Sequence, residues 1–231
     1  MLAKHKKISK KEMKEDKLVT SFYRAKELFY EYQGKILIGF GVLVVIVVAF
    51  ILINQNNEKN NVKANALLAK VMPLYDAGQY KDAIDGKKLE NIDGLKKIAD
   101  EYGSSEAGEM AKLFLANSYF YTSDFDNALK YYKDFSGKGD EFKAAAYAGT
   151  ASCLEAKKEY KDAADYYKKA ASVAKGNFEN PEYLLKAGIC FMSANDNSSA
   201  KELFTRLKED YKSSISAYEV DKYLAMIGDK E

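Results

Sequence analysis

One uninterrupted apolar run constrains the fold of this chain more than any other feature. Residues 36–53 read ILIGFGVLVVIVVAFILI and include no charged or amide side chain. As a helix, this run would be roughly 27 Å long, close to the hydrocarbon thickness of a bilayer. A backbone in lipid must satisfy its hydrogen bonds within the segment, so we predict a single transmembrane helix over 36–53. The alternative is a buried core helix, which would normally show a polar face.

The residues around the run predict an uncleaved signal anchor whose N-terminal side is cytoplasmic. The preceding segment is too long for the charged region of a cleaved signal peptide, and NQNN at 54–57 offers no small-residue cleavage site. Residues 1–35 hold ten basic and five acidic side chains, which favours the cytoplasm by the positive-inside rule. Close to the run the bias is weaker, so the orientation depends on the distal lysines. Residues 17–33 predict a short amphipathic helix that either lies on an anionic leaflet or simply extends the span.

The rest of the chain is expected to be helical, without a catalytic or metal site. Apolar residues make up 47% of the sequence, enough for a hydrophobic core, and two Pro and no Trp favour helices over strands. Residues 36–231 carry 26 basic and 29 acidic side chains, whereas a nucleic-acid-binding domain would be basic over its folded part. With one His and two Cys, we expect no metal, no cofactor, no small-molecule substrate and no enzyme.

Three segments repeat one pattern, a small residue followed four positions later by an aromatic residue. The pairs are Ala128 with Tyr132, Ala163 with Tyr167 and Ala200 with Phe204, and a fourth segment begins at Ala83. The intervals between these alanines are 45, 35 and 37 residues. Another small residue stands twelve positions before each of the last three alanines, at Ala116, Ala151 and Gly188, and would let paired helices approach closely. A period near 34 residues with two helices per unit is the tetratricopeptide signature, and the chain resembles that family.

This resemblance implies an all-α domain in which stacked helical hairpins bury one another's apolar faces. We expect about four hairpin units and a capping helix over 216–227. Pro73 argues against a regular first helix in the first unit, and the longer first interval predicts a loop insertion around 85–93. The predicted domains are a basic cytosolic segment over 1–35, the transmembrane helix over 36–53, a polar linker over 54–61 and the repeat domain over 62–231.

The resemblance also implies where a ligand binds. In tetratricopeptide proteins the first helix of each unit lines a groove at fixed offsets, and exposed apolar residues there suit extended polypeptide. Groups that clamp a peptide carboxylate have Lys where this chain has Leu113, Ala148 and Leu185, so we do not expect it to recognise acidic C-terminal tails. The alternative is that some groove positions face another helix of the domain. Carried onto this sequence, they are Met110, Leu113, Asn117, Phe120 and Tyr121, then Ser152 and Glu155, then Leu185, Ile189 and Met192.

Two further motifs receive no catalytic role. Cys153 and Cys190 occupy equivalent positions of successive units. Neighbouring helices pack about 8–10 Å apart, whereas a disulfide needs Cα atoms within about 7 Å, so we predict buried free thiols. The sequence SVAK at 172–175 matches the S-x-x-K pattern of penicillin-recognising enzymes, but the supporting motifs are absent. A membrane-bound hydrolase that uses Ser172 and Lys175 is the enzymatic alternative.

The whole arrangement resembles the YfgM-like group of bacterial inner-membrane proteins, which have one N-terminal span and a tetratricopeptide-like periplasmic domain. The basic start, Gln33-Gly34-Lys35 before the span, and the repeats carry this resemblance. It implies a single-pass protein of the bacterial inner membrane with a cytoplasmic N-terminus and a periplasmic repeat domain. That group is associated with the Sec translocon and periplasmic chaperones, so we expect protein or extended-polypeptide partners and a scaffold that assists export. A scaffold for envelope assembly or cell division is the alternative.

Overall fold

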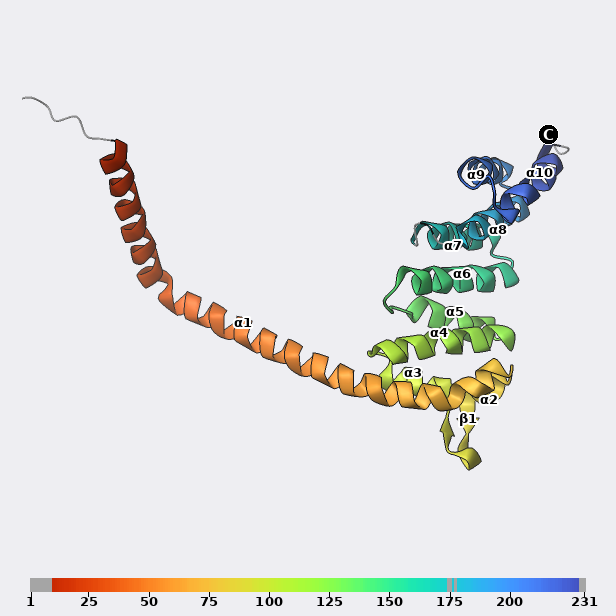
Figure 1. Ribbon diagram of the computed structural model, residues 1–231, viewed down its shortest axis with the longest axis horizontal. Helices are drawn as coiled ribbons and strands as arrows, with labels where there is room; N and C mark the ends of the chain where they lie inside the picture. Colours follow the sequence, from red (N-terminus) through yellow and green to blue (C-terminus); the bar gives the residue numbers. More distant parts are fainter. Residues whose placement is uncertain (1–9, 174–175, 177, 229–231) are drawn as a thin grey trace, which may run out of the picture. The chain divides into compact units, whose positions relative to one another are not determined.

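The computed structural model describes residues 10–173, 176 and 178–228 of the 231-residue chain (Figure 1). Residues 1–9, which belong to the predicted basic segment, lie outside the described residues. The chain divides into two compact units, Met1–Asn56 and Asn57–Glu231. Helix α1 (Lys10–Asp76) is 67 residues long and contributes residues to both units.

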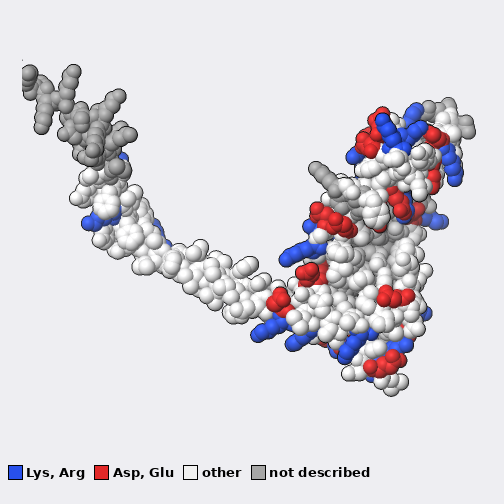
Figure 2. Space-filling view, viewed as in Figure 1, with Lys and Arg blue, Asp and Glu red and all other residues white. Residues whose placement is uncertain are grey.

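In the first unit, α1 carries the whole apolar run as one continuous helix. The side chains of this run are exposed, and Leu37, Ile38 and Phe50 are each 70% exposed. Figure 2 shows the corresponding stretch of α1 without Lys, Arg, Asp or Glu. Among the described residues, α1 is the one helix long and apolar enough to cross a membrane, and its most apolar part is not buried. The run is therefore not a buried core helix here, and both a membrane anchor and a signal sequence fit it.

Residues 54–61, for which the sequence suggested a polar linker, continue α1 without a break. They contain no Pro or Gly, and helix on both sides lets the helix propagate through them. Two of their asparagines, Asn57 and Asn61, belong to the second unit and accept hydrogen bonds from other residues of that unit. The hydroxyl of Ser104 donates to Asn57 Oδ1 at 3.2 Å, and the backbone N–H of Ala107 donates to Asn61 Oδ1 at 2.8 Å.

The first helical hairpin pairs the end of α1 with α2 (Tyr80–Asp85) and α3 (Leu95–Tyr102). Pro73 lies inside α1, so the expectation of an irregular first helix is wrong. A proline removes only one backbone N–H, and α1 ends within a turn after it, so little of the helix is affected.

The predicted loop insertion is a short β-hairpin that separates α2 from α3. It consists of β1 (Gly86–Lys87), the 3-10 turn η1 (Lys88–Glu90) and β2 (Ile92–Asp93), paired antiparallel. The ends of α2 and α3 approach closely at its base, because a Cβ atom at Gly94 would lie 2.2 Å from the carbonyl oxygen of Ile84. Glycine at this position therefore allows the β-hairpin to leave the chain between α2 and α3, which together take the place of the second helix of the unit.

Three more hairpins and a final helix follow (Figure 1). The hairpins are α4 (Glu106–Tyr121) with α5 (Phe125–Asp134), α6 (Asp140–Ala156) with α7 (Tyr160–Val173) and α8 (Asn180–Ser193) with α9 (Asn197–Asp210), and the capping helix is α10 (Ile215–Gly228). The turn inside each hairpin has one residue with positive φ: Ser123 at 62°, Lys158 at 65° and Asn195 at 60°. Asp124 and Asp196 then cap the helices that follow them through their side chains.

The repeat-defining residues form the interior of the stack. The contact of a small residue with a large ring occurs more than once. A Cβ atom at Gly149 would lie 2.3 Å from the ring of Tyr132, and one at Gly188 would lie 2.2 Å from the ring of Phe204. Cys153 and Cys190 are buried free thiols, as predicted, and burial raises the pKa of each to about 12. The buried repeat-defining residues are Ala83, Ala116, Ala128, Tyr132, Ala151, Ala163, Tyr167, Gly188, Ala200 and Phe204.

Candidate protein-binding surface

The first helices of the hairpins, α4, α6 and α8, carry the predicted groove positions. Leu113 and Leu185 are each only 6% exposed, because both belong to the hydrophobic clusters that hold neighbouring helices together. The expectation that these two residues lie on an open surface is therefore wrong, because both lie in the core. Tyr121 is 59% exposed. The remaining groove positions are half-buried: Met110, Asn117, Phe120, Ser152, Glu155, Ile189 and Met192.

Aromatic side chains from α1, α2 and α4 gather at the first two hairpins. Tyr121 stacks on Tyr80 with ring centroids 4.6 Å apart. Tyr75 meets Tyr80 edge to face at 5.6 Å and Phe114 at 5.1 Å. The sequence predicted Tyr121 here but missed Tyr75 and Tyr80, because Pro73 and the insertion obscure the offsets of the first unit. Since the rings pack on one another, most of this cluster holds the hairpins together and leaves mainly Tyr121 accessible.

Asn117 joins three helices through its amide. Tyr132 Oη on α5 donates to Asn117 Oδ1 at 2.5 Å, and Asn117 Nδ2 donates to Tyr75 Oη on α1 at 3.1 Å. Burial raises the pKa of both tyrosines, most strongly that of Tyr132, so these hydroxyls, already protonated at neutral pH, stay protonated further into the alkaline range. Asn117 is therefore committed to bonds inside the domain rather than offered to a ligand.

The next unit repeats this arrangement with different residues. Ser152 Oγ and Tyr167 Oη are hydrogen-bonded at 2.9 Å, and Tyr167 Oη donates to Glu155 at 3.1 Å. In the last unit the equivalent positions hold Ile189 and Phe204, which have no polar group to satisfy. In the earlier units the polar groove residues Asn117 and Ser152 are thus hydrogen-bonded to tyrosine hydroxyls, whereas the equivalent residue on α8 is the apolar Ile189.

An open hollow of about 680 Å³ lies between α8 and the start of α10. It contains the predicted groove residues Leu185 and Ile189 and adds two large apolar side chains that the sequence analysis missed. Phe178, before α8, is 89% exposed, and Ile215, the first residue of α10, is 79% exposed. Both stand out as single large apolar residues in polar segments, which is the signal that could have identified them. The hollow is lined by Phe178, Pro181, Glu182, Leu185, Lys186, Ile189, Ser213, Ser214, Ile215, Ser216 and Glu219.

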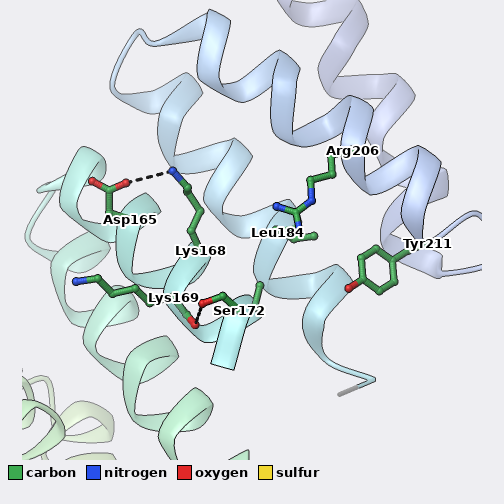
Figure 3. Close-up of a pocket in the computed structure, with 8 residues that line it drawn as sticks. Asp165, Lys168, Lys169, Ser172, Leu184, Arg206 and Tyr211 are labelled. Carbon is green, nitrogen blue, oxygen red and sulfur yellow. Dashed lines mark hydrogen bonds and ion pairs between the residues drawn. The ribbon is translucent and has the colours of Figure 1, made fainter. Parts of the chain in front are cut away.

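A second hollow, of about 450 Å³, contains Ser172 of the S-x-x-K motif (Figure 3). Figure 3 shows Lys168 turned towards Asp165, with which it forms an ion pair at 3.6 Å, and Ser172 turned towards the backbone. The Ser172 hydroxyl donates to the carbonyl oxygen of Lys169 at 2.8 Å, a bond that does not activate a nucleophile. Lys175, the other residue of the motif, lies outside the described residues.

No group of three or more His, Cys, Asp or Glu side chains that could hold a metal ion occurs among the described residues. Several acidic and basic side chains of the repeat domain form pairs and small networks, such as Lys112 with both Glu109 and Asp134, each at 2.9 Å.

Two family models match the repeat domain. Residues 115–180 match one described as tetratricopeptide repeat, and residues 182–214 match a second with the same description. No curated protein matches the chain. The matched residues cover part of α4 and nearly all of α5 to α9, the hairpins whose spacing carries the repeat pattern. Residues 115–180 and 182–214 are therefore tetratricopeptide repeats, within an all-α fold in which a long apolar N-terminal helix is followed by stacked helical hairpins.

Proposed function

We propose that this protein is a membrane-anchored scaffold whose repeat domain binds partner proteins or extended polypeptide segments outside the bacterial inner membrane. The apolar run of α1 is the anchor, with the N-terminus in the cytoplasm and the repeat domain in the periplasm. The scaffold assists protein export beside a translocon or a chaperone, as its resemblance to the YfgM-like group suggests. Anchoring keeps the binding surface at high local concentration beside the membrane.

The observation that carries the proposal is the hollow between α8 and α10. A folded domain normally buries large apolar side chains, yet Phe178 and Ile215 are left almost fully exposed beside an open depression. Apolar side chains of that kind around a concave site are typical of surfaces that take a partner. Half-buried Ile189 adds to the apolar lining of the same hollow.

In-cell photocrosslinking tests this proposal. A photoreactive amino acid is placed at Phe178, Ile189 or Ile215, which line the hollow, and matched controls carry it at the exposed positions Lys133 on α5 and Glu202 on α9. We expect the first three positions to capture exported chains, translocon subunits or chaperones, identified by mass spectrometry. Capture of one dominant envelope-assembly protein would favour the coordinating scaffold instead. Equal capture from the control positions, or none from the test positions, would contradict the hollow between α8 and α10 as the binding surface.

A further inference from the structure

The charge around the hollow between α8 and α10 distinguishes among the segments that it could hold. Glu182, Lys186 and Glu219 are its charged lining residues. Lys186 Nζ lies 2.8 Å from Glu182 Oε1, so these two charges largely neutralise each other. Glu219 is exposed, and within the described part of the chain no ion pair involves it. The hollow therefore combines apolar walls with one uncompensated carboxylate.

The rest of the rim is uncharged and hydroxyl-rich. Ser213 and Ser214 lie in the turn before α10, and Ser216 follows exposed Ile215 in the first turn of that helix. The Ser214 hydroxyl already accepts a hydrogen bond from the backbone N–H of Ala217 at 3.1 Å, which caps α10. These groups tolerate a peptide backbone but supply no positive charge that would attract an acidic segment.

We propose that this hollow binds an extended polypeptide segment in which large apolar side chains have Lys or Arg close by in the sequence. The apolar side chains lie against Phe178, Ile189 and Ile215, and the basic side chain lies beside Glu219. This inference rests on the proposed function and specifies the class of segment that the scaffold prefers. Since the carboxylate is exposed, it contributes selectivity rather than most of the affinity.

The test uses the full chain in lipid nanodiscs and three short acetylated and amidated peptides. The peptides share one Leu-Ile-Leu centre and differ only in flanking residues, which are Lys, Ser or Glu. We expect the Lys-flanked peptide to bind about three- to fivefold more tightly than the Ser-flanked one, and the Glu-flanked peptide to bind most weakly. This preference should fade at high salt because exposed charges are screened.

Reversing the charge of Glu219 separates a local effect of this carboxylate on the peptides from attraction by the overall charge of the protein. Glu219→Lys should invert the order of the three peptides, whereas Glu209→Lys, the same change on α9 outside the hollow, should leave it unchanged. Equal binding of all three peptides, or the same shift in both variants, would overturn the basic-segment preference while leaving the proposed function standing. Failure of every peptide to bind would instead count against the proposed function itself.

Discussion

The position of a Cβ atom on Gly188 lies 2.2 Å from a ring carbon of Phe204, so the helices α8 and α9 meet at a distance that only glycine permits. Phe204 is fully buried, and its ring cannot move without displacing its neighbours. Gly188 is the small residue of the last repeat, and Phe204 is the aromatic residue of the same unit. The small and aromatic residues of the repeat pattern therefore occur where paired helices pack closely.

Gly188→Ala should therefore lower the free energy of unfolding by about 1–3 kcal/mol through overpacking. Urea unfolding followed by circular dichroism measures the change. The matched control is Gly228→Ala at the end of α10, where an added Cβ atom meets nothing within 4 Å and little change is expected. Equal stability of the Gly188→Ala variant and the parent protein would contradict the close approach of α8 to α9.

We expect Asn117 to stabilise the fold through its hydrogen bonds with the hydroxyls of Tyr132 and Tyr75. Asn117→Ala leaves the buried Tyr132 hydroxyl without its acceptor and should cost about 1–3 kcal/mol of stability. Adding Tyr132→Phe removes the orphaned hydroxyl and should recover part of that loss, which a double-mutant cycle measures. Strict additivity of the two changes would show that the hydrogen bond does not stabilise the fold.

Glu109 should hold the loop after α5 in place. Its carboxylate accepts bonds from the Ser136 backbone N–H at 2.8 Å and the Ser136 hydroxyl at 2.9 Å, and it pairs with Lys112. Glu109→Ala should cost about 2–3 kcal/mol, because Lys112 and Ser136 then lose a nearly buried partner. The control Glu106→Ala, on the exposed side of α4, should change stability much less. Equal effects of the two variants in urea unfolding would contradict this role.

The buried thiols predict a dependence of stability on alkaline pH. Folding raises the pKa of Cys153 and Cys190 from an ordinary value of 9.0 to about 12. The protonated thiols are thus favoured by the fold, so their contribution is complete below pH 9.0 and is lost as the pH rises towards about 12. We expect native protein at pH 8 to react with maleimide far more slowly than urea-unfolded protein. Equal labelling rates in the two states would contradict the burial.

Much of the fold was predictable because it rests on periodic patterns. The run at 36–53 and the alanine–aromatic spacing both follow from repeated local requirements of a helix, in the bilayer or in a hairpin stack. The bond from Ala107 to Asn61, by contrast, joins residues 46 positions apart, and no pattern in the sequence marks it. The continuous helix through 54–61 could therefore not be distinguished from a linker.

The candidate site was only partly predictable for a related reason. Family offsets identify positions on a helix, but the tilt of neighbouring helices decides which side chains are covered, and Leu113 and Leu185 are covered. Phe178 and Ile215 come from a loop and a helix end, which offsets within a repeat do not reach. Only the assembled hairpins bring these two residues together around one hollow.

Binding of an unfolded polypeptide to the full chain in nanodiscs tests the central claim most directly. A reduced, carboxymethylated model protein serves as the probe, and the test variant is Phe178→Ser with Ile215→Ser. The matched control is Leu89→Ser, which removes a fully exposed apolar side chain on the β-hairpin outside the hollow. We predict binding at least about tenfold weaker for the double variant, from the loss of two apolar contacts, and unchanged binding for the control. Unchanged binding of the double variant would contradict the hollow as the polypeptide-binding site.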